Sequence, residues 1–141
     1  MLRLTFVLIL ITLTASKCVS EISPEFSRLD GNWKLYKIVN GFRAPNTPAD
    51  QEPKNIEILE IDAQEKYLVR KIDGFIKEKT KIDIRNIPDG SPNGRLSLVF
   101  VESDTYSYLE IDESKGELSL YQKCPIGAVL ADGNTYVYKK M

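Results

Sequence analysis

The side chains that could do chemistry in this chain are few, because the sequence contains no histidine. This excludes Ser–His and Cys–His nucleophilic catalysis, and every metal or haem site that needs an imidazole ligand. The two cysteines, Cys18 and Cys124, are too few for a thiolate zinc cage. The carboxylates cannot be placed together as an acid–base pair. The scattered ones include Glu57, Glu60, Glu110, Asp112 and Glu113. We therefore expect no enzyme, no metal site and no cofactor.

Basic residues give a weak signal of their own. Lys77, Lys79 and Lys81 alternate along one predicted strand and therefore share one face. They could bind an anion or an anionic surface, but exposed lysines on strands more commonly serve solubility and block edge pairing. The formal net charge of −1 leaves no basic excess to neutralise phosphates. A nucleic-acid partner is therefore not expected.

The N-terminus has the order of a secretory signal peptide. Arg3 precedes an apolar run over 4–13, and a small, polar stretch follows. The run of about ten residues is half of what a membrane-spanning helix requires. We expect cleavage after Ser16 or Ser20 and a secreted protein, extracellular or, in a bacterium, periplasmic. The remaining segment, 21–141, has room for one domain with one core.

The cleavage site decides what Cys124 can do. A cut after Ser16 keeps Cys18, which can then form a disulfide with Cys124 in an oxidising compartment. A cut after Ser20 removes Cys18 and leaves Cys124 single, as a small buried apolar residue. We favour the disulfide, because free thiols are uncommon in secreted domains.

The elements that must position any site are strands. Behind the signal, short runs rich in Ile, Val, Leu, Tyr and Phe alternate with Gly, Pro, Asn and Asp, without a helical period. The predicted strands are 32–39, 55–62, 66–72, 74–85, 95–102, 105–112, 117–124 and 135–139. Short turns between them join neighbours antiparallel. We expect an all-β fold, an eight-stranded up-and-down antiparallel β-barrel.

Alternation within these strands marks one apolar or aromatic face. The residues expected to face the interior and to line a ligand site are Leu35, Leu98, Phe100, Tyr106, Tyr108, Leu118 and Leu120. Eight closed strands leave an interior that side chains just fill, or that holds one small ligand. The sequence leaves both possibilities open.

One long segment, 41–54, interrupts the pattern of strands. Pro45, Pro48 and Pro53 preclude a long helix or a central strand there. In a barrel such a segment lies over one mouth as a lid or an interaction loop, unless it is a passive connector.

The chain resembles the lipocalins at three places that stand in the family's order. The stretch 31–35, with Gly31 and Trp33, resembles the Gly-x-Trp motif that opens the first strand. Asp104, with a tyrosine four residues later, resembles the turn of the second motif. The stretch 120–125 resembles the third motif, whose arginine is here Lys123. The resemblance covers about residues 26 to 125, and the chain then ends on a strand, as in the related fatty-acid-binding proteins.

The resemblance implies structural roles for Gly31, Trp33 and Lys123, with Lys123 beside Trp33 at the closed end of the barrel. It also implies a secreted binding protein that holds a small hydrophobic or amphipathic ligand inside the barrel without catalysis. The Arg-x-Tyr carboxylate clamp of the fatty-acid-binding proteins is here 136–138, without the arginine, so that clamp is not expected. The alternative is an interaction or inhibitor protein with a filled barrel that binds another protein through its N-terminal arm and the 41–54 loop.

Overall fold

A computed structural model describes residues 22–41, 48, 50–89 and 92–141. The predicted signal peptide, Cys18 and much of the 41–54 segment lie outside the described residues. In the described part, a short helix precedes ten strands. They are α2 (Pro24–Leu29), β1 (Gly31–Val39), β2 (Asp50–Gln51), β3 (Glu57–Asp62), β4 (Tyr67–Ile72), β5 (Phe75–Ile87), β6 (Arg95–Phe100), β7 (Thr105–Asp112), β8 (Glu117–Tyr121), β9 (Cys124–Pro125) and β10 (Thr135–Lys140).

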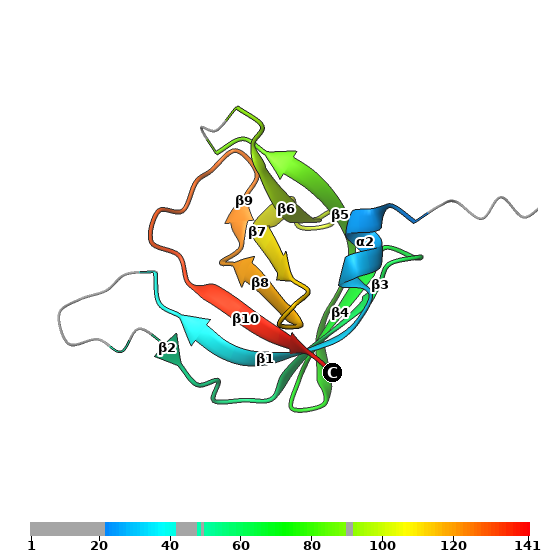
Figure 1. Cartoon of the computed structure of the whole chain (residues 1–141), viewed down its shortest axis with the longest axis vertical. Coiled ribbons are helices and arrows are strands. Elements are labelled where there is room, and N and C mark those ends of the chain that lie inside the picture. Colours follow the sequence, from blue (N-terminus) through cyan, green and yellow to red (C-terminus); the bar gives the residue numbers. More distant parts are fainter. Residues whose placement is uncertain (1–21, 42–47, 49, 90–91) are drawn as a thin grey trace, which may run out of the picture.

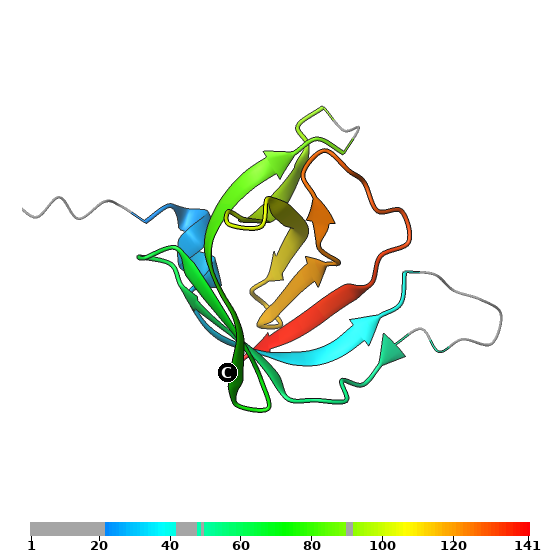
Figure 2. The same ribbon diagram turned by 180° about the vertical axis from the view of Figure 1, so that it is seen from behind.

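Eight of these strands form a closed ring, as Figures 1 and 2 show from its two sides. In hydrogen-bonded order they are β1, β3, β4, β5, β6, β7, β8 and β10, and β10 pairs with β1 to close the circle. Each neighbour runs antiparallel to the next. The short strands β2 and β9 pair with β1 and β7. The predicted all-β antiparallel fold is thus confirmed at the level of a ring of eight strands.

The predicted strand boundaries agree with the observed ones to within a few residues. The reason is that β-branched and aromatic residues fill the strands, whereas Gly, Asn and Asp occupy the turns. Between β4 and β5, Asp73 and Gly74 have φ values of 51° and 83°. Positive φ at both central residues is what a two-residue type I′ turn requires, so the Asp-Gly pair sets the register of this hairpin.

Two strands differ from the prediction. β5 runs on to Ile87, and its first half pairs with β4 whereas its second half pairs with β6. The strand predicted over 117–124 is interrupted, because Gln122 and Lys123 separate β8 from β9. Both residues of this interruption are among those that line a cavity of the ring.

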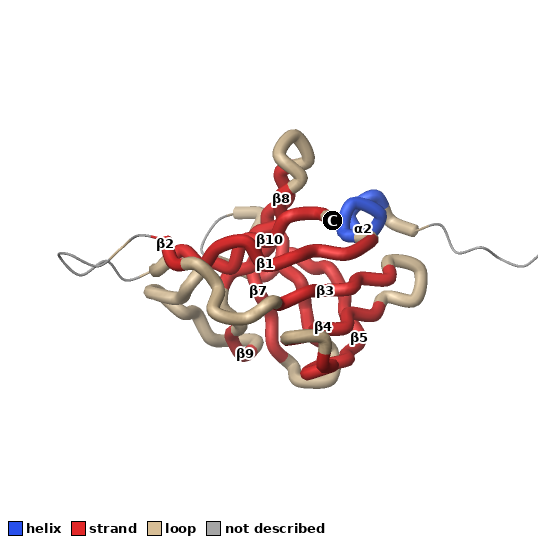
Figure 3. Tube along the Cα trace, turned by 90° about the horizontal axis from the view of Figure 1, so that it is seen from below, coloured by secondary structure: helices blue, strands red, loops and turns tan. Residues whose placement is uncertain are grey.

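The helix α2, which the sequence patterns do not predict, packs against one end of the ring (Figure 3). Phe26 and Leu29 project from it into the core of the ring. Arg28 forms an ion pair with Glu113, in the turn before β8, and the ammonium of Lys66, just before β4, lies 5.0 Å from the centre of the Phe26 ring. The α2 end of the ring is therefore the end at which β4 and β8 begin.

Trp33 is buried at the α2 end, with 2% of its surface exposed. Its indole Nε1 donates a hydrogen bond of 2.7 Å to the carbonyl of Leu29. Gly31 opens the strand with a φ of 117°, which favours glycine. The cation over the Trp33 ring is Lys140, at 5.3 Å, because the register of β1 and β10 places these residues opposite each other. The expectation that Lys123 lies there is wrong, since Lys123 belongs to the interruption between β8 and β9.

The half of the ring nearest α2 is filled with apolar side chains. They include Trp33, Ile61, Ile82, Leu98, Leu109 and Leu118. All of them are at most 4% exposed. This end therefore has no room for a ligand, and the site must be sought in the other half.

Candidate functional site: a cavity between two ion pairs

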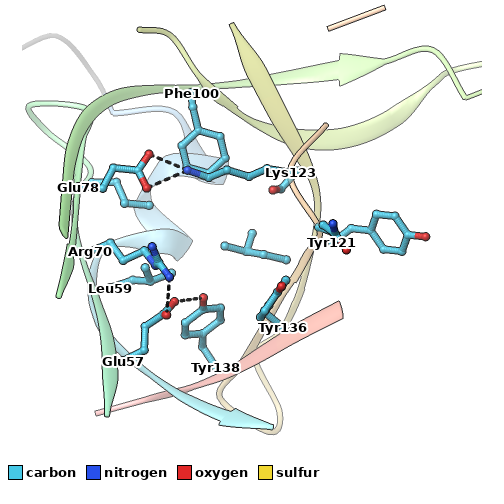
Figure 4. A pocket seen from close by; sticks show the side chains of 13 residues that line it. Glu57, Leu59, Arg70, Glu78, Phe100, Tyr121, Lys123, Tyr136 and Tyr138 are labelled. Atoms are coloured by element: carbon cyan, nitrogen blue, oxygen red, sulfur yellow. Dashed lines mark hydrogen bonds and ion pairs between the residues drawn. The ribbon is translucent and has the colours of Figure 1, made fainter. Parts of the chain in front are cut away.

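A cavity of about 300 Å³ occupies the half of the ring away from α2 (Figure 4). One part of its lining is apolar and consists of Leu59, Leu68, Phe100 and Leu120. The other part carries charges and hydroxyls and includes Glu57, Arg70, Glu78, Lys123, Tyr136 and Tyr138. Ligand sites in proteins start at about this volume and commonly combine apolar walls with a few polar groups.

The first polar group joins three strands of the ring. The Tyr138 hydroxyl of β10 donates a hydrogen bond of 2.7 Å to Oε1 of Glu57 on β3. Arg70 of β4 donates from Nη2 to Oε2 of the same carboxylate at 2.9 Å. Burial, and then the charge of Glu57, raise the pKa of Tyr138. The hydrogen bond to Glu57 raises the pKa of Arg70, so at neutral pH Tyr138 keeps its proton and Arg70 its charge.

The second polar group lies beside the first, because Glu78 on β5 is the register partner of Arg70 on β4, while Lys123 reaches Glu78 from the other side of the cavity (Figure 4). Lys123 donates from Nζ to both carboxylate oxygens of Glu78, at 2.6 and 2.8 Å. The same ammonium lies 3.7 Å from the centre of the Phe100 ring. A cation over an aromatic face is attracted by the ring's quadrupole, so Phe100 and Glu78 together fix the position of Lys123.

The residues predicted to line a ligand site fall into three groups. Phe100 and Leu120 line the cavity. Leu35, Leu98 and Leu118 belong to the apolar core of the ring but are not among the residues that line the cavity.

Tyr106 and Tyr108 face the other side of the sheet, so their assignment to the interior is wrong. They pair with Val99 and Ser97, and together with Val99 and Cys124 they form a separate cluster. The Tyr106 hydroxyl donates a hydrogen bond of 2.7 Å to the carbonyl of residue 128. The segment that follows β9 thus covers the outer face of β7. Because both faces of β7 are covered, alternation along the strand does not show which face is the inner one. The aromatic face is the outer one.

Cys124 belongs to this outer cluster and is buried, with 5% of its surface exposed. Within the described part of the chain it is a free thiol. Cys18 lies outside that part. A disulfide between the two therefore stays a prediction.

Three charged residues of the cavity, Glu57, Arg70 and Glu78, were not singled out as site residues by the sequence. A signal for them exists in the alternation of the strands. Glu57 is in phase with Leu59 and Ile61, which face the core. A charged residue on the apolar face of a strand is buried at a cost unless it has a partner, and that cost marks it as a candidate site residue.

The lysines of β5 lie on the outside of the ring. Lys79 and Lys81 share a face, as predicted, and their ammonium groups lie 5.5 and 5.8 Å from the centre of the Tyr67 ring. The proline-rich segment is described only in part. Asn40 donates from its side chain to the carbonyl of Pro48 at 2.9 Å, and β2 pairs with the end of β1. Residues 42–47 and 49, which would form most of a lid, lie outside the described residues.

Within the described ranges, no group of three or more His, Cys, Asp or Glu side chains is placed to hold a metal ion. No helix in those ranges has the length and apolar character needed to cross a membrane. No protein-family model, no curated protein and no solved structure matches this chain. Its function is therefore inferred from the geometry of the cavity.

Proposed function

We propose that this protein is a secreted, lipocalin-like binding protein that holds a small amphipathic molecule in a β-barrel without catalysing a reaction. The observation that carries the proposal is the cavity of about 300 Å³ inside the ring, which both apolar and polar side chains line. Eight-stranded barrels are of the size that holds one small ligand. The lipocalin-like Gly-x-Trp motif at the start of β1 and the signal-like N-terminus add support from the sequence.

The lining indicates how such a ligand would lie. Leu59, Phe100 and Leu120 offer surface to an apolar tail, which gains free energy by leaving water. Arg70 and Tyr136, which lie beside Leu59 and Leu120 on the neighbouring strands, offer hydrogen-bond donors to a polar end. The cavity contains no pair of groups arranged as nucleophile and base, which is why we propose binding rather than catalysis.

A fluorescent apolar probe, N-phenylnaphthylamine, tests this proposal when titrated into the protein. We expect saturable binding to one site. Ser107→Leu should weaken it by about tenfold or more, because Ser107 lines the cavity and a larger side chain would fill part of it.

Ser119→Leu is the matched control. Ser119 lies on the neighbouring strand β8, opposite the exposed Glu110, and faces away from the cavity. This variant should bind the probe as the wild type does. Wild-type protein that binds no probe, or a Ser107→Leu variant with unchanged affinity, would contradict the proposed function.

A second candidate, an interaction protein, is favoured by an exposed apolar tip at the β4–β5 turn. Phe75, Ile76 and Ile56 are 71%, 63% and 55% exposed. Reciprocal hydrogen bonds between Ile56 and Asp73 hold the tip together. Exposed apolar patches of this kind often mark contacts with other molecules. Loss of probe binding in the titration above would shift the inference to this candidate.

A further inference from the structure

The charges of the cavity are balanced by the chain's own residues. Arg70 is paired with Glu57, and Lys123 is paired with Glu78. All four side chains line the cavity. A ligand that enters this space therefore meets two complete ion pairs and no unpaired charge of either sign.

Much of the remaining hydrogen-bonding capacity of the cavity is that of donors. A guanidinium has five N–H groups, and within the described part of the chain Arg70 uses only Nη2, toward Glu57. Tyr136 also lines the cavity, and among the described residues its hydroxyl has no hydrogen-bond partner. Both oxygens of Glu57, and both oxygens of Glu78, already accept hydrogen bonds. A ligand would satisfy the site best by bringing an acceptor.

A charged acceptor fits poorly. A carboxylate that approaches the free N–H groups of Arg70 also approaches Glu57, which is 2.9 Å from that guanidinium. Glu78 lies opposite Arg70 on the neighbouring strand β5 and also interacts with Arg70 through its charge. Like charges in a partly buried site repel strongly, and a buried charge without its own partner is costly. A cationic head meets the same difficulty beside Arg70 and Lys123.

We propose that the cavity selects amphipathic ligands whose polar end is an uncharged hydrogen-bond acceptor, such as an alcohol, ester or amide, and that Glu57 is the residue that rejects carboxylates. This inference rests on the proposed binding function. Glu57 occupies the place on Arg70 and Tyr138 that the carboxylate of a ligand would otherwise take.

The substitution Glu57→Gln isolates this role. Glutamine keeps the shape of the side chain and an oxygen that can accept from Tyr138, but it removes the negative charge. Arg70 then loses the carboxylate that accepts its hydrogen bond, while Glu78 keeps its ion pair with Lys123, so Arg70 can bind a carboxylate of the ligand. Glu60→Gln is the matched control, because Glu60 lies on the same strand and pairs with Lys71 at 2.5 Å, yet is not among the residues that line the cavity.

The experiment is displacement of the bound N-phenylnaphthylamine at neutral pH by decanol, decanoic acid and decylamine, which share one apolar tail. For the wild type we expect decanol to bind about tenfold or more tightly than either charged compound. Glu57→Gln should raise the affinity for decanoic acid by about tenfold or more, so that the acid binds at least as tightly as decanol. Glu60→Gln should rank the three compounds as the wild type does.

The outcomes separate this inference from the proposed function. Wild-type protein that binds decanoic acid as tightly as decanol overturns the inference alone, as does a folded Glu57→Gln variant without a gain for the acid. If neither the probe nor any of the three compounds binds, the proposed function fails and the inference fails with it. If thermal unfolding shows that Glu57→Gln is not folded, Glu78→Gln replaces it. That variant frees Lys123 and should raise the affinity for the acid in the same direction.

Discussion

The hydroxyl of Tyr138 is an ionisable group in the wall of the cavity that is both hydrogen-bonded and buried. It donates to Glu57 at 2.7 Å, and only 4% of the residue is exposed. Burial and the neighbouring carboxylate both favour the neutral phenol, so the pKa is raised above its ordinary value of about 10. A raised pKa in the folded state means that the stabilising contribution is complete below about pH 10 and is lost as the pH rises further.

Tyr138→Phe should therefore make the free energy of unfolding less dependent on alkaline pH. We expect lower stability than the wild type at neutral pH, since a buried hydrogen bond is lost, but a shallower decline above about pH 10. Urea unfolding at a series of pH values measures this. Tyr36→Phe is the control, because Tyr36 is 55% exposed. Loss of its hydroxyl should leave the slope of the unfolding free energy against pH as it is in the wild type. Equal slopes for the wild type and Tyr138→Phe would refute the assignment.

Single residues also show where a sequence stops being informative. The burial of Trp33 follows from its size and its place in a strand. Its cationic neighbour does not, because Lys140 lies opposite Trp33 only through the register of β1 and β10. Tyr106 is buried as expected but on the outer face, because the segment after β9 covers that side. Alternation separates the two faces of a strand, and only the packing of distant segments decides which face is inside.

At the scale of elements, the strands of the ring are read well from the sequence, whereas α2 is not. The turns are local, so residues such as Asp73 and Gly74 mark them directly. α2 has a start signal as well, since Ser23 caps it and Pro24 and Glu25 occupy its first turn. With six residues, however, it is too short for a helical period to stand out.

α2 stabilises the ring through two buried side chains, Phe26 and Leu29. The contribution of Leu29 can be tested. Leu29 is 0% exposed in the core, so Leu29→Ala should lower the free energy of unfolding by about 2 to 4 kcal/mol. Arg28→Ala should cost less than about 1 kcal/mol, because its ion pair with Glu113 is exposed. Urea unfolding compares the two variants.

The Leu29→Ala variant also tests whether the packed α2 end of the ring is independent of the cavity at the other end. Leu29 does not line the cavity, so a folded Leu29→Ala variant should keep the affinity for N-phenylnaphthylamine. A loss of affinity at full folding would show that α2 shapes the cavity after all.

At the scale of the whole molecule, β10 is the strand that closes the ring. It pairs with β1 on one side and β8 on the other, and it carries Tyr136 and Tyr138 into the cavity wall. Deleting residues 135–141 should therefore open two strand edges, abolish cooperative unfolding and favour aggregation. Circular dichroism during heating, together with gel filtration, measures these effects.

A synthetic peptide with the sequence of residues 133–141 provides the control for this deletion. The peptide should add as a strand between β1 and β8 and restore probe binding, because the missing contacts are main-chain hydrogen bonds and a few inward side chains. A peptide of the same composition in scrambled order should not. Cooperative unfolding of the truncated chain without any peptide would contradict this role of β10.

Because the first and last strands close the ring, the contacts of the cavity form late in folding. Trp33 and Lys140 meet across nearly the whole described length of the chain, and contacts between such distant residues form slowly, in milliseconds to seconds for all-β proteins of this kind. Tyr138 reaches Glu57 only when this closure has taken place. The cavity therefore does not exist in any partly closed intermediate, so a ligand cannot guide the folding of the ring. It can only slow the reopening, and its effect should appear in the unfolding rate and not in the folding rate.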